Sequence, residues 1–393
     1  MPDSRTVDLP HRRIRLLAVA GARPNFMKIA PLMKELARRS DRFEAILVHT
    51  GQHYDQAMSE SFFRDLAIPE PDVNLGVGSG THAEQTAQVL VAIEKILLER
   101  KPDVVLVVGD VNSTIAATLA AVKLHIPVAH VEAGLRSWDR SMPEEINRVL
   151  TDAVSHWLFT TEPSAETNLL REGVPRDRIH FVGNVMIDTL LAHRERARDL
   201  DTLSRLGLEP GRYAVLTLHR PSNVDSADQL RRLFGVLSRL GDRLPVVFPV
   251  HPRTRNAIEK NLQGERLNLR MTEPLGYLEF LRLLMDAQMV LTDSGGIQEE
   301  TTALGVPCLT LRDSTERPVT VSEGTNTIVG TDPGAIEDAI EKQLFSPPTP
   351  GRRPALWDGQ AAVRIVEILE RDLRGGQIAA SNSGIASAPG AHR

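Results

Sequence analysis

The chain has 393 residues, which is too many for one ordinary hydrophobic core and predicts two domains. Hydrophobic residues make up 41% and charged residues 25%, an ordinary globular composition, and a net charge of −5 argues against a nucleic-acid-binding protein. The single cysteine, Cys308, excludes a disulfide within the chain and suits the reducing cytoplasm. Residues 1–13 lack the apolar core of a signal peptide, and no apolar run is long enough to span a membrane.

Short apolar runs alternate with helical patterns along nearly the whole chain. The runs are rich in β-branched residues and lack polar alternation, which is typical of strands buried on both faces of a parallel sheet. Between them, segments such as 113–124 and 278–285 space their apolar residues with helical period. The predicted strands cover 15–20, 44–49, 104–108, 128–131, 157–160 and 179–182 in the first half, and 213–218, 246–250, 267–271, 289–292, 307–311 and 327–329 in the second.

This alternation predicts an α/β protein with two doubly wound, Rossmann-like domains. Their boundary is expected within 188–211, a charged segment with a helical pattern. The predicted units are an N-terminal domain over 13–188, a C-terminal domain over 189–358, a last helix over 359–374 that packs back on the first domain, and a disordered tail over 375–393.

One helix start in the second domain has the features of a phosphate site. Ser294, Gly295 and Gly296 follow a predicted strand and open a helix, where free amide groups and the helix dipole attract an anion. The two glycines allow the backbone to approach a ligand closely. Glu300 stands one turn further on, where it can accept hydrogen bonds from ribose hydroxyls, and Arg317 can clamp a diphosphate. The structural alternative is a helix cap at Ser294 followed by a tight turn.

Two histidines, His219 and His251, end predicted strands of the same domain. Two histidines at equivalent strand ends are better explained as pocket residues than as chance packing. Their separation matches no zinc motif, so no metal is expected. The chain has no Gly-x-x-x-x-Gly-Lys-Ser/Thr loop, and the glycines of 76–80 do not follow a strand, so no dinucleotide cofactor is expected either.

Carboxylates gather at the strand ends of the first domain. Asp110 and Glu132 follow consecutive predicted strands, and Glu144 opens a helix beside a second glutamate. Burial and crowding raise carboxylate pKa values, which suits a general acid. The structural alternatives are a helix cap for Asp110 and dipole stabilisation for Glu144. The positive charges expected on the same rim belong to Arg23 and Lys28, for which the alternative is a solvated helical turn.

In combination these segments resemble the non-hydrolysing UDP-N-acetylglucosamine 2-epimerases, a family with the GT-B architecture of two Rossmann-like domains facing across a cleft. The resemblance runs from about Arg15 to about Leu373. Each motif is weak alone, but their order and spacing are specific. The motifs are Gly21-Ala22-Arg23-Pro24, Gly109-Asp110, His130 to Arg136, Pro143 to Arg148, Gly183-Asn184, His219-Arg220, Pro249-Val250-His251, Thr292 to Glu300 and Thr315 to Pro318.

The resemblance implies an enzyme that inverts carbon 2 of UDP-N-acetylglucosamine. The hydrogen on carbon 2 is not beside a carbonyl, but loss of UDP from carbon 1 builds positive charge that acidifies it. A carboxylate then removes the proton to give 2-acetamidoglucal, and UDP adds back after a proton arrives on the opposite face. The family's acid/base carboxylates match Asp110, Glu132 and Glu144, and its histidine near the leaving diphosphate matches His219.

The resemblance also implies substrate-binding residues and partners. Arg136 and Arg148 match arginines of the active-site motifs, and Phe280 falls where the family packs an aromatic ring near uracil. The expected partner is a UDP-sugar, with no nucleic acid, membrane, cofactor or metal, and the chain is expected to form a homodimer in the cytoplasm. The positions that match UDP-binding residues are Arg23, His251, Ser294, Gly295, Gly296, Glu300 and Arg317.

Four segments depart from the family's well-studied bacterial members. They are Asn25-Phe26, Tyr54-Asp55, the short loop 137–142 and Pro221 after His219-Arg220. Several of them bear on a second, regulatory UDP-sugar site, so little activation through such a site is expected. The alternative functions are a GT-B glycosyltransferase, a hydrolysing epimerase, an epimerase of a related diacetamido uronic acid nucleotide, and a UDP-sugar sensor without turnover.

Overall fold

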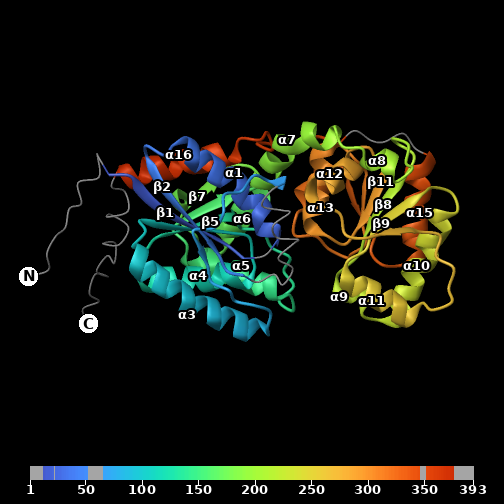
Figure 1. Cartoon of the computed structure of the whole chain (residues 1–393), viewed down its shortest axis with the longest axis horizontal. Helices are drawn as coiled ribbons and strands as arrows, with labels where there is room; N and C mark the ends of the chain where they lie inside the picture. The colour runs from blue at the N-terminus through green and yellow to red at the C-terminus, as the bar shows by residue number, and fades with distance from the viewer. Residues whose placement is uncertain (1–11, 22, 52–64, 346–350, 376–393) are drawn as a thin grey trace, which may run out of the picture.

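Two parallel sheets organise the protein, one in each half of the chain, and they form the two lobes of Figure 1. The computed structural model describes residues 12–21, 23–51, 65–345 and 351–375. All strand pairs within these residues are parallel, which confirms the predicted α/β class with two Rossmann-like domains. The expected tail over 375–393 lies, apart from residue 375, outside the described residues.

The first sheet has seven strands, most of them buried because helices cover both of its faces. The strands are β1 (Ile14–Ala20), β2 (Phe43–His49), β3 (Val73–Asn74), β4 (Val104–Val108), β5 (Val128–Ala133), β6 (Trp157–Thr160) and β7 (Ile179–Phe181). Their order across the sheet is β3-β2-β1-β4-β5-β6-β7. The sequence did not indicate β3, because two residues are too few to show a pattern.

The second sheet has six strands in the order β10-β9-β8-β11-β12-β13. They are β8 (Ala214–Thr217), β9 (Val246–Pro249), β10 (Arg270–Thr272), β11 (Met289–Thr292), β12 (Cys308–Thr310) and β13 (Asn326–Ile328). The edge strand β10 is displaced from the predicted range 267–271, since its residues are half-buried or exposed and carry little hydrophobic signal. Cys308 lies fully buried in β12.

Helices connect the strands, and several begin with proline, whose missing N–H costs nothing at a first helical position. In the first half they are α1 (Arg23–Arg38), α3 (His82–Arg100), α4 (Asn112–Lys123), α5 (Pro143–Val154), α6 (Pro163–Arg171), the 3₁₀ turn η1 (Arg176–Arg178) and α7 (Val185–Arg198). In the second they are α8 (Thr202–Arg205), α9 (Pro221–Val224), α10 (Ala227–Gly241), α11 (Pro252–Asn261), α12 (Tyr277–Met285), α13 (Gly295–Leu304), α14 (Val319–Ser322), α15 (Pro333–Phe345) and α16 (Ala361–Arg374). None of the described helices is long and apolar enough to cross a membrane.

Two helices join the lobes. The expected boundary at 188 falls inside α7, which packs against α1 on one side and α12 and α13 on the other. Charged residues such as Glu195 and Arg196 lie on the exposed face of this helix, whereas Asp188, Ile187 and Leu190 are buried. The last helix, α16, packs against α1 beside the first sheet (Figure 1). Asp188 anchors it by accepting hydrogen bonds from the backbone of Ala361 and Ala362.

Candidate active site

A cavity of about 430 Å³ lies between the two halves, at the carboxyl ends of both sheets. It brings together most of the residues singled out from the sequence. From the first half its lining includes Lys28, Asp110, Glu144 and Arg148. From the second half its lining includes His219, His251, Phe280, Ser294, Gly295, Gly296, Glu300 and Arg317.

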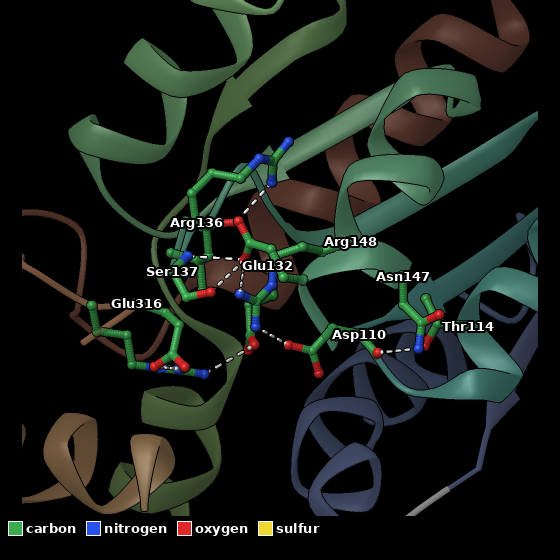
Figure 2. A network of polar contacts seen from close by, with 12 residues as sticks. Asp110, Thr114, Glu132, Arg136, Ser137, Asn147, Arg148 and Glu316 are labelled. Atoms are coloured by element: carbon green, nitrogen blue, oxygen red, sulfur yellow. Dashed lines mark hydrogen bonds and ion pairs between the residues drawn. The ribbon is translucent and has the colours of Figure 1, made fainter. Parts of the chain in front are cut away.

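Asp110 reaches the cavity from the turn after β4. It does not cap α4, whose N-cap is Val111, so the structural alternative for Asp110 does not apply. Its Oδ2 lies 2.5 Å from an Nη atom of Arg148, as Figure 2 shows. Burial opposes ionisation, but Arg148 and Lys28 outweigh it and hold the pKa of Asp110 below its usual value. The expected rise in the pKa is therefore wrong for Asp110, because cations rather than other carboxylates are its nearest charged neighbours.

Glu132 lies directly behind the cavity wall at an irregularity of β5. The register of β5 against β6 shifts between Val131 and Ala133, and Glu132 itself has a φ of +73°. A bulge of this kind re-aims a side chain at the cost of local strain. The Glu132 carboxylate accepts hydrogen bonds from Lys28 Nζ at 2.7 Å and from Arg317 at 3.2 Å. Its Oε2 has no hydrogen-bond partner among the described residues.

Arg317 ties the two halves together at the cavity. Its guanidinium contacts Glu132 of the first half and, through Nε at 2.9 Å, Glu299 of α13. Burial disfavours the charge, but these carboxylates outweigh it and hold the pKa of Arg317 above its usual value. The guanidinium also lies against Gly295, where an added Cβ would come within 2.6 Å of Nη1. The predicted diphosphate clamp thus adjoins the predicted anion-binding helix start.

That helix start is open toward the cavity. Ser294 occupies the N-cap position of α13, but its side chain makes no capping hydrogen bond. A capping role therefore does not explain the Ser294 hydroxyl. The backbone N–H of Ser294 donates to the Thr292 hydroxyl. Glu300 follows in the second turn and lines the same cavity.

His219 is oriented by a buried carboxylate. Its Nδ1 lies 2.9 Å from Asp293 Oδ1, and Asp293 also accepts hydrogen bonds from the backbone N–H groups of His219 and Arg220. With Nδ1 engaged, Nε2 of His219 is the nitrogen left for a ligand. The rings of His219 and His251 lie 6.4 Å apart between centroids. Sequence reasoning passed over Asp293, although it precedes Ser294 directly.

Two further carboxylates beside the cavity were missed. Glu162, after β6, and Glu299, in α13, are both buried, and each has an Oε2 without a hydrogen-bond partner among the described residues. Burial, reinforced by the charge of Glu299, raises the pKa of Glu162 to about 7. Burial also raises the pKa of Glu299 against the pull of Arg317. The sequence signal for Glu299 was its place beside Glu300, and the signal for Glu162 was its place two residues after a predicted strand, as for Ser294.

Of the predicted residues whose side chains the structure describes, Glu132 and Arg136 do not line the cavity. Arg136 is fully buried beneath β5, where it pairs with Asp152 at 2.7 Å and with Glu172 at 2.6 Å. The side chain of Arg23 and the Tyr54-Asp55 segment lie outside the described residues. Within the part of the chain that the structure describes, no group of three or more His, Cys, Asp or Glu side chains is arranged to hold a metal ion.

Comparison with known proteins places the chain among its relatives. The family model for UDP-N-acetylglucosamine 2-epimerase matches residues 34–370. A UDP-N-acetylglucosamine 2-epimerase homolog of Methanococcus maripaludis is 45% identical over 362 residues, which cover 91% of this chain and 99% of the relative. The UDP-2,3-diacetamido-2,3-dideoxy-D-glucuronate 2-epimerase of Pseudomonas aeruginosa is 43% identical over 363 residues, covering 91% and 100% of the two chains.

A solved structure gives the same picture. The Methanocaldococcus jannaschii UDP-GlcNAc 2-epimerase, crystallised in complex with UDP-GlcNAc and UDP, matches with a TM-score of 0.84 and 42% identity, covering 91% of this chain and 99% of that one. The fold and the cavity thus define an α/β enzyme of the GT-B-like class. The chain belongs to the UDP-N-acetylglucosamine 2-epimerase family.

Proposed function

We propose that the protein interconverts UDP-N-acetylglucosamine and UDP-N-acetylmannosamine without releasing the free sugar. The observation that carries the proposal is the division of the cavity. Its first-half wall presents Asp110 and Glu144, while its second-half wall presents the α13 start and Arg317. One wall is suited to proton transfer and the other to holding a diphosphate.

The proposed reaction has two halves that mirror one another. A carboxylate takes the proton from carbon 2 as the C1–O bond breaks, the electron pair of that bond stays on UDP, and a C1=C2 double bond forms. The resulting 2-acetamidoglucal then receives a proton on the opposite face of carbon 2, and a β-phosphate oxygen of UDP attacks carbon 1. Asp110, Glu132 and Glu144 are the proposed acid/base groups. His219, oriented by Asp293, is proposed to stabilise the charge that develops on the diphosphate.

The other binding positions receive roles on the same basis. The start of α13 is proposed to hold the diphosphate, Glu300 the ribose, and Phe280 the uracil ring. Lys28 and Arg148 are proposed to set the charge state of the carboxylates that they contact. Arg136 is proposed to act only through the backbone below Glu132, because it does not reach the cavity.

A second candidate substrate is favoured by one relative, which acts on a diacetamido glucuronate nucleotide. Its carboxylate would call for an additional cation facing the sugar. The described arginines and lysine of the cavity are already paired with carboxylates: Lys28 with Glu132, Arg148 with Asp110, and Arg317 with Glu299. Arg220 likewise lies near Glu316. This pairing supports the neutral N-acetylhexosamine as substrate.

Incubation of the pure protein with UDP-N-acetylglucosamine and no acceptor, followed by proton and phosphorus NMR, tests the proposal. The expected result is UDP-N-acetylmannosamine at equilibrium with the substrate and no build-up of UDP. Free N-acetylmannosamine with an equal amount of UDP would identify a hydrolysing enzyme. Turnover of the diacetamido glucuronate nucleotide alone would identify the second candidate, and no turnover of either would favour a sensor or a glycosyltransferase.

We also propose that the protein is a homodimer working in the cytoplasm. Helix α5 carries an exposed apolar stripe of Ile146, Leu150 and Val154, and the nearby α3 exposes Val91 and Leu98. Such a patch is a common feature of an interface. Light scattering is expected to give twice the mass of 43.3 kDa, and Leu150→Glu to halve it. The matched control is Leu170→Glu on α6, and a monomeric wild type would contradict the proposal.

A further inference from the structure

The turn that carries Asp110 is held by side chains from three different elements. Asn25 of α1 donates to the Val108 carbonyl at 2.9 Å. His130 of β5 lies with Nε2 2.9 Å from the Gly109 carbonyl, and Asn147 of α5 donates to the Asp110 carbonyl at 2.9 Å. Figure 2 shows the contact of Asn147 with Asp110. Three consecutive carbonyls are thus fixed from three directions, which holds Asp110 in one place.

His130 is the only titratable member of these three. It is fully buried, and its Nδ1 lies 2.6 Å from Asp152 Oδ1. The Gly109 carbonyl can only accept a hydrogen bond, so Nε2 must carry a proton. The other oxygen of Asp152 lies 2.7 Å from the Arg136 guanidinium and accepts a hydrogen bond from the backbone N–H of Gly134 at 3.0 Å, contacts that favour the ionised carboxylate. An ionised Asp152 is also only an acceptor, so Nδ1 must carry a proton as well.

We propose that His130 is a buried imidazolium that positions Asp110 by bridging the Gly109 carbonyl and Asp152. The residue does not touch the cavity, so it acts through the turn and not on substrate. This role rests on the proposed function of Asp110 in proton transfer. Two positions further along the same strand stands Glu132, so His130 fixes the element that bears one proposed carboxylate and the turn that bears another.

The charges around His130 support this protonation state. Asp152 faces it from α5, and the Gly109 carbonyl faces it from the turn after β4. Arg136 binds the other oxygen of Asp152 and, on its far side, Glu172. With His130 charged, the group holds two cations and two anions. Glu172 reaches solvent, whereas Asp152 is buried in direct contact with the His130 ring, and a carboxylate at this range favours the charged ring.

Nitrogen-15 NMR of the wild type, labelled at histidine, tests the protonation state directly. The His130 signals are identified by their loss in His130→Gln. The expected result at pH 7.5 is a ring with a proton on both nitrogens. A ring with one unprotonated nitrogen would overturn the proposal. This arm requires no turnover, and His130→Asn serves for the assignment if His130→Gln does not fold.

Two amide variants separate the two ends of the ring. Glutamine places its N–H near the Nε2 position and keeps the Gly109 contact, whereas asparagine places its N–H near Nδ1 and keeps only the Asp152 contact. His130→Asn is expected to lower kcat about tenfold to a hundredfold with KM and UDP affinity unchanged, since small misplacements of a reacting group have effects of this size. His130→Gln is expected to keep kcat within about threefold while melting at a lower temperature.

The opposite ranking of the two variants in kcat, or an equal loss in both at matched folding, would overturn the positioning role. A rise in KM instead of a fall in kcat would do the same. If the wild type turns over no UDP-sugar, the proposed function fails, while the NMR result still decides whether His130 is an imidazolium.

Discussion

Asp110 lines the cavity and Glu132 lies directly behind its wall, and the two are placed there by different local structures. Asp110 stands in an ordinary turn whose carbonyls are held by side chains, while Glu132 stands at a strand irregularity with a left-handed backbone conformation. Both are surrounded by cations, Arg148 for the first and Lys28 with Arg317 for the second. For Asp110 these cations hold the pKa below its usual value, so it is in the ionised form, which accepts a proton.

Loss of the carboxylate charge at Asp110 or Glu144 is expected to abolish most proton transfer. Asp110→Asn and Glu144→Gln should each lower kcat by about 10²–10⁴-fold, the usual contribution of one acid/base group, with UDP affinity near that of the wild type. Steady-state kinetics and calorimetry with UDP measure the two quantities. Asp139→Asn, an exposed carboxyl in the neighbouring loop, is the control. Normal turnover in either cavity variant would remove that residue from the mechanism.

Glu162 is expected to make the stability of the protein depend on pH. Burial raises its pKa in the folded state to about 7 from an ordinary value of 4.5, so the folded state binds the proton more tightly than the unfolded state. The stabilisation of the folded state by the proton on Glu162 is complete below about pH 4.5 and is lost as the pH rises toward 7. Glutamine at position 162 does not titrate. The free energy of unfolding of Glu162→Gln minus that of the wild type should therefore rise by up to about 3 kcal/mol between pH 4.5 and pH 8.

Chemical denaturation across this pH range measures the difference between the two proteins. Glu323→Gln, at an exposed site directly after α14, is the control and should show no such trend. A constant difference between Glu162→Gln and the wild type would show that Glu162 ionises normally in the folded protein.

At the level of single residues, the sequence predicted those that follow strands and not those that support them. Ser294 and His219 stand directly after predicted strands, where the geometry of a parallel sheet brings side chains to one edge. Glu162 also follows a predicted strand, but its raised pKa depends on burial and on Glu299, and His130 acts through Asp152 and Gly109; no local pattern indicates such contacts. Arg136 shares a motif with Glu132 but pairs with Asp152 and Glu172 away from the cavity lining, which motif spacing does not reveal.

Among the elements that line the cavity, the start of α13 brings its backbone close to a buried cation. Gly295 lies against Arg317, and Arg317 is held by carboxylates on two sides, so it cannot move aside cheaply. Gly295→Ala is therefore expected to displace the guanidinium and weaken UDP binding about tenfold or more, which corresponds to about 1.4 kcal/mol.

Calorimetry with UDP measures this change in affinity. The control is Gly235→Ala in α10, where the nearest atom to an added Cβ is 3.9 Å away and helix propensity improves. Wild-type UDP affinity in Gly295→Ala would show that neither Gly295 nor the place of Arg317 matters for the nucleotide.

The strands were predictable because central strands of a parallel sheet are buried on both faces and read as short apolar runs. The same argument explains the two failures, since β3 and β10 lie at sheet edges where few residues are buried. The sequence of helix α7 suggests a linker because it is charged. Only the packing of its apolar face against helices of both lobes shows that α7 is a packed helix and not a linker.

On the scale of the whole molecule, the two lobes divide the proposed chemistry. Contacts such as Arg317 with Glu132 and Asn184 with Glu299 cross between them, so the wall with the carboxylates and the wall with the proposed diphosphate site face the same cavity. This arrangement lets one lobe hold UDP while the other exchanges protons with carbon 2. It also explains why neither half of the sequence carries a complete catalytic motif.

The central claim is proton exchange at carbon 2 with UDP retained, and one measurement tests it most directly. The protein is incubated with UDP-N-acetylglucosamine in D₂O, and the nucleotide sugars are followed by NMR. Product UDP-N-acetylmannosamine is predicted to carry deuterium at carbon 2 from the first turnovers, and recovered substrate is predicted to acquire it gradually. Product that retains the original hydrogen at carbon 2 would contradict elimination with solvent exchange.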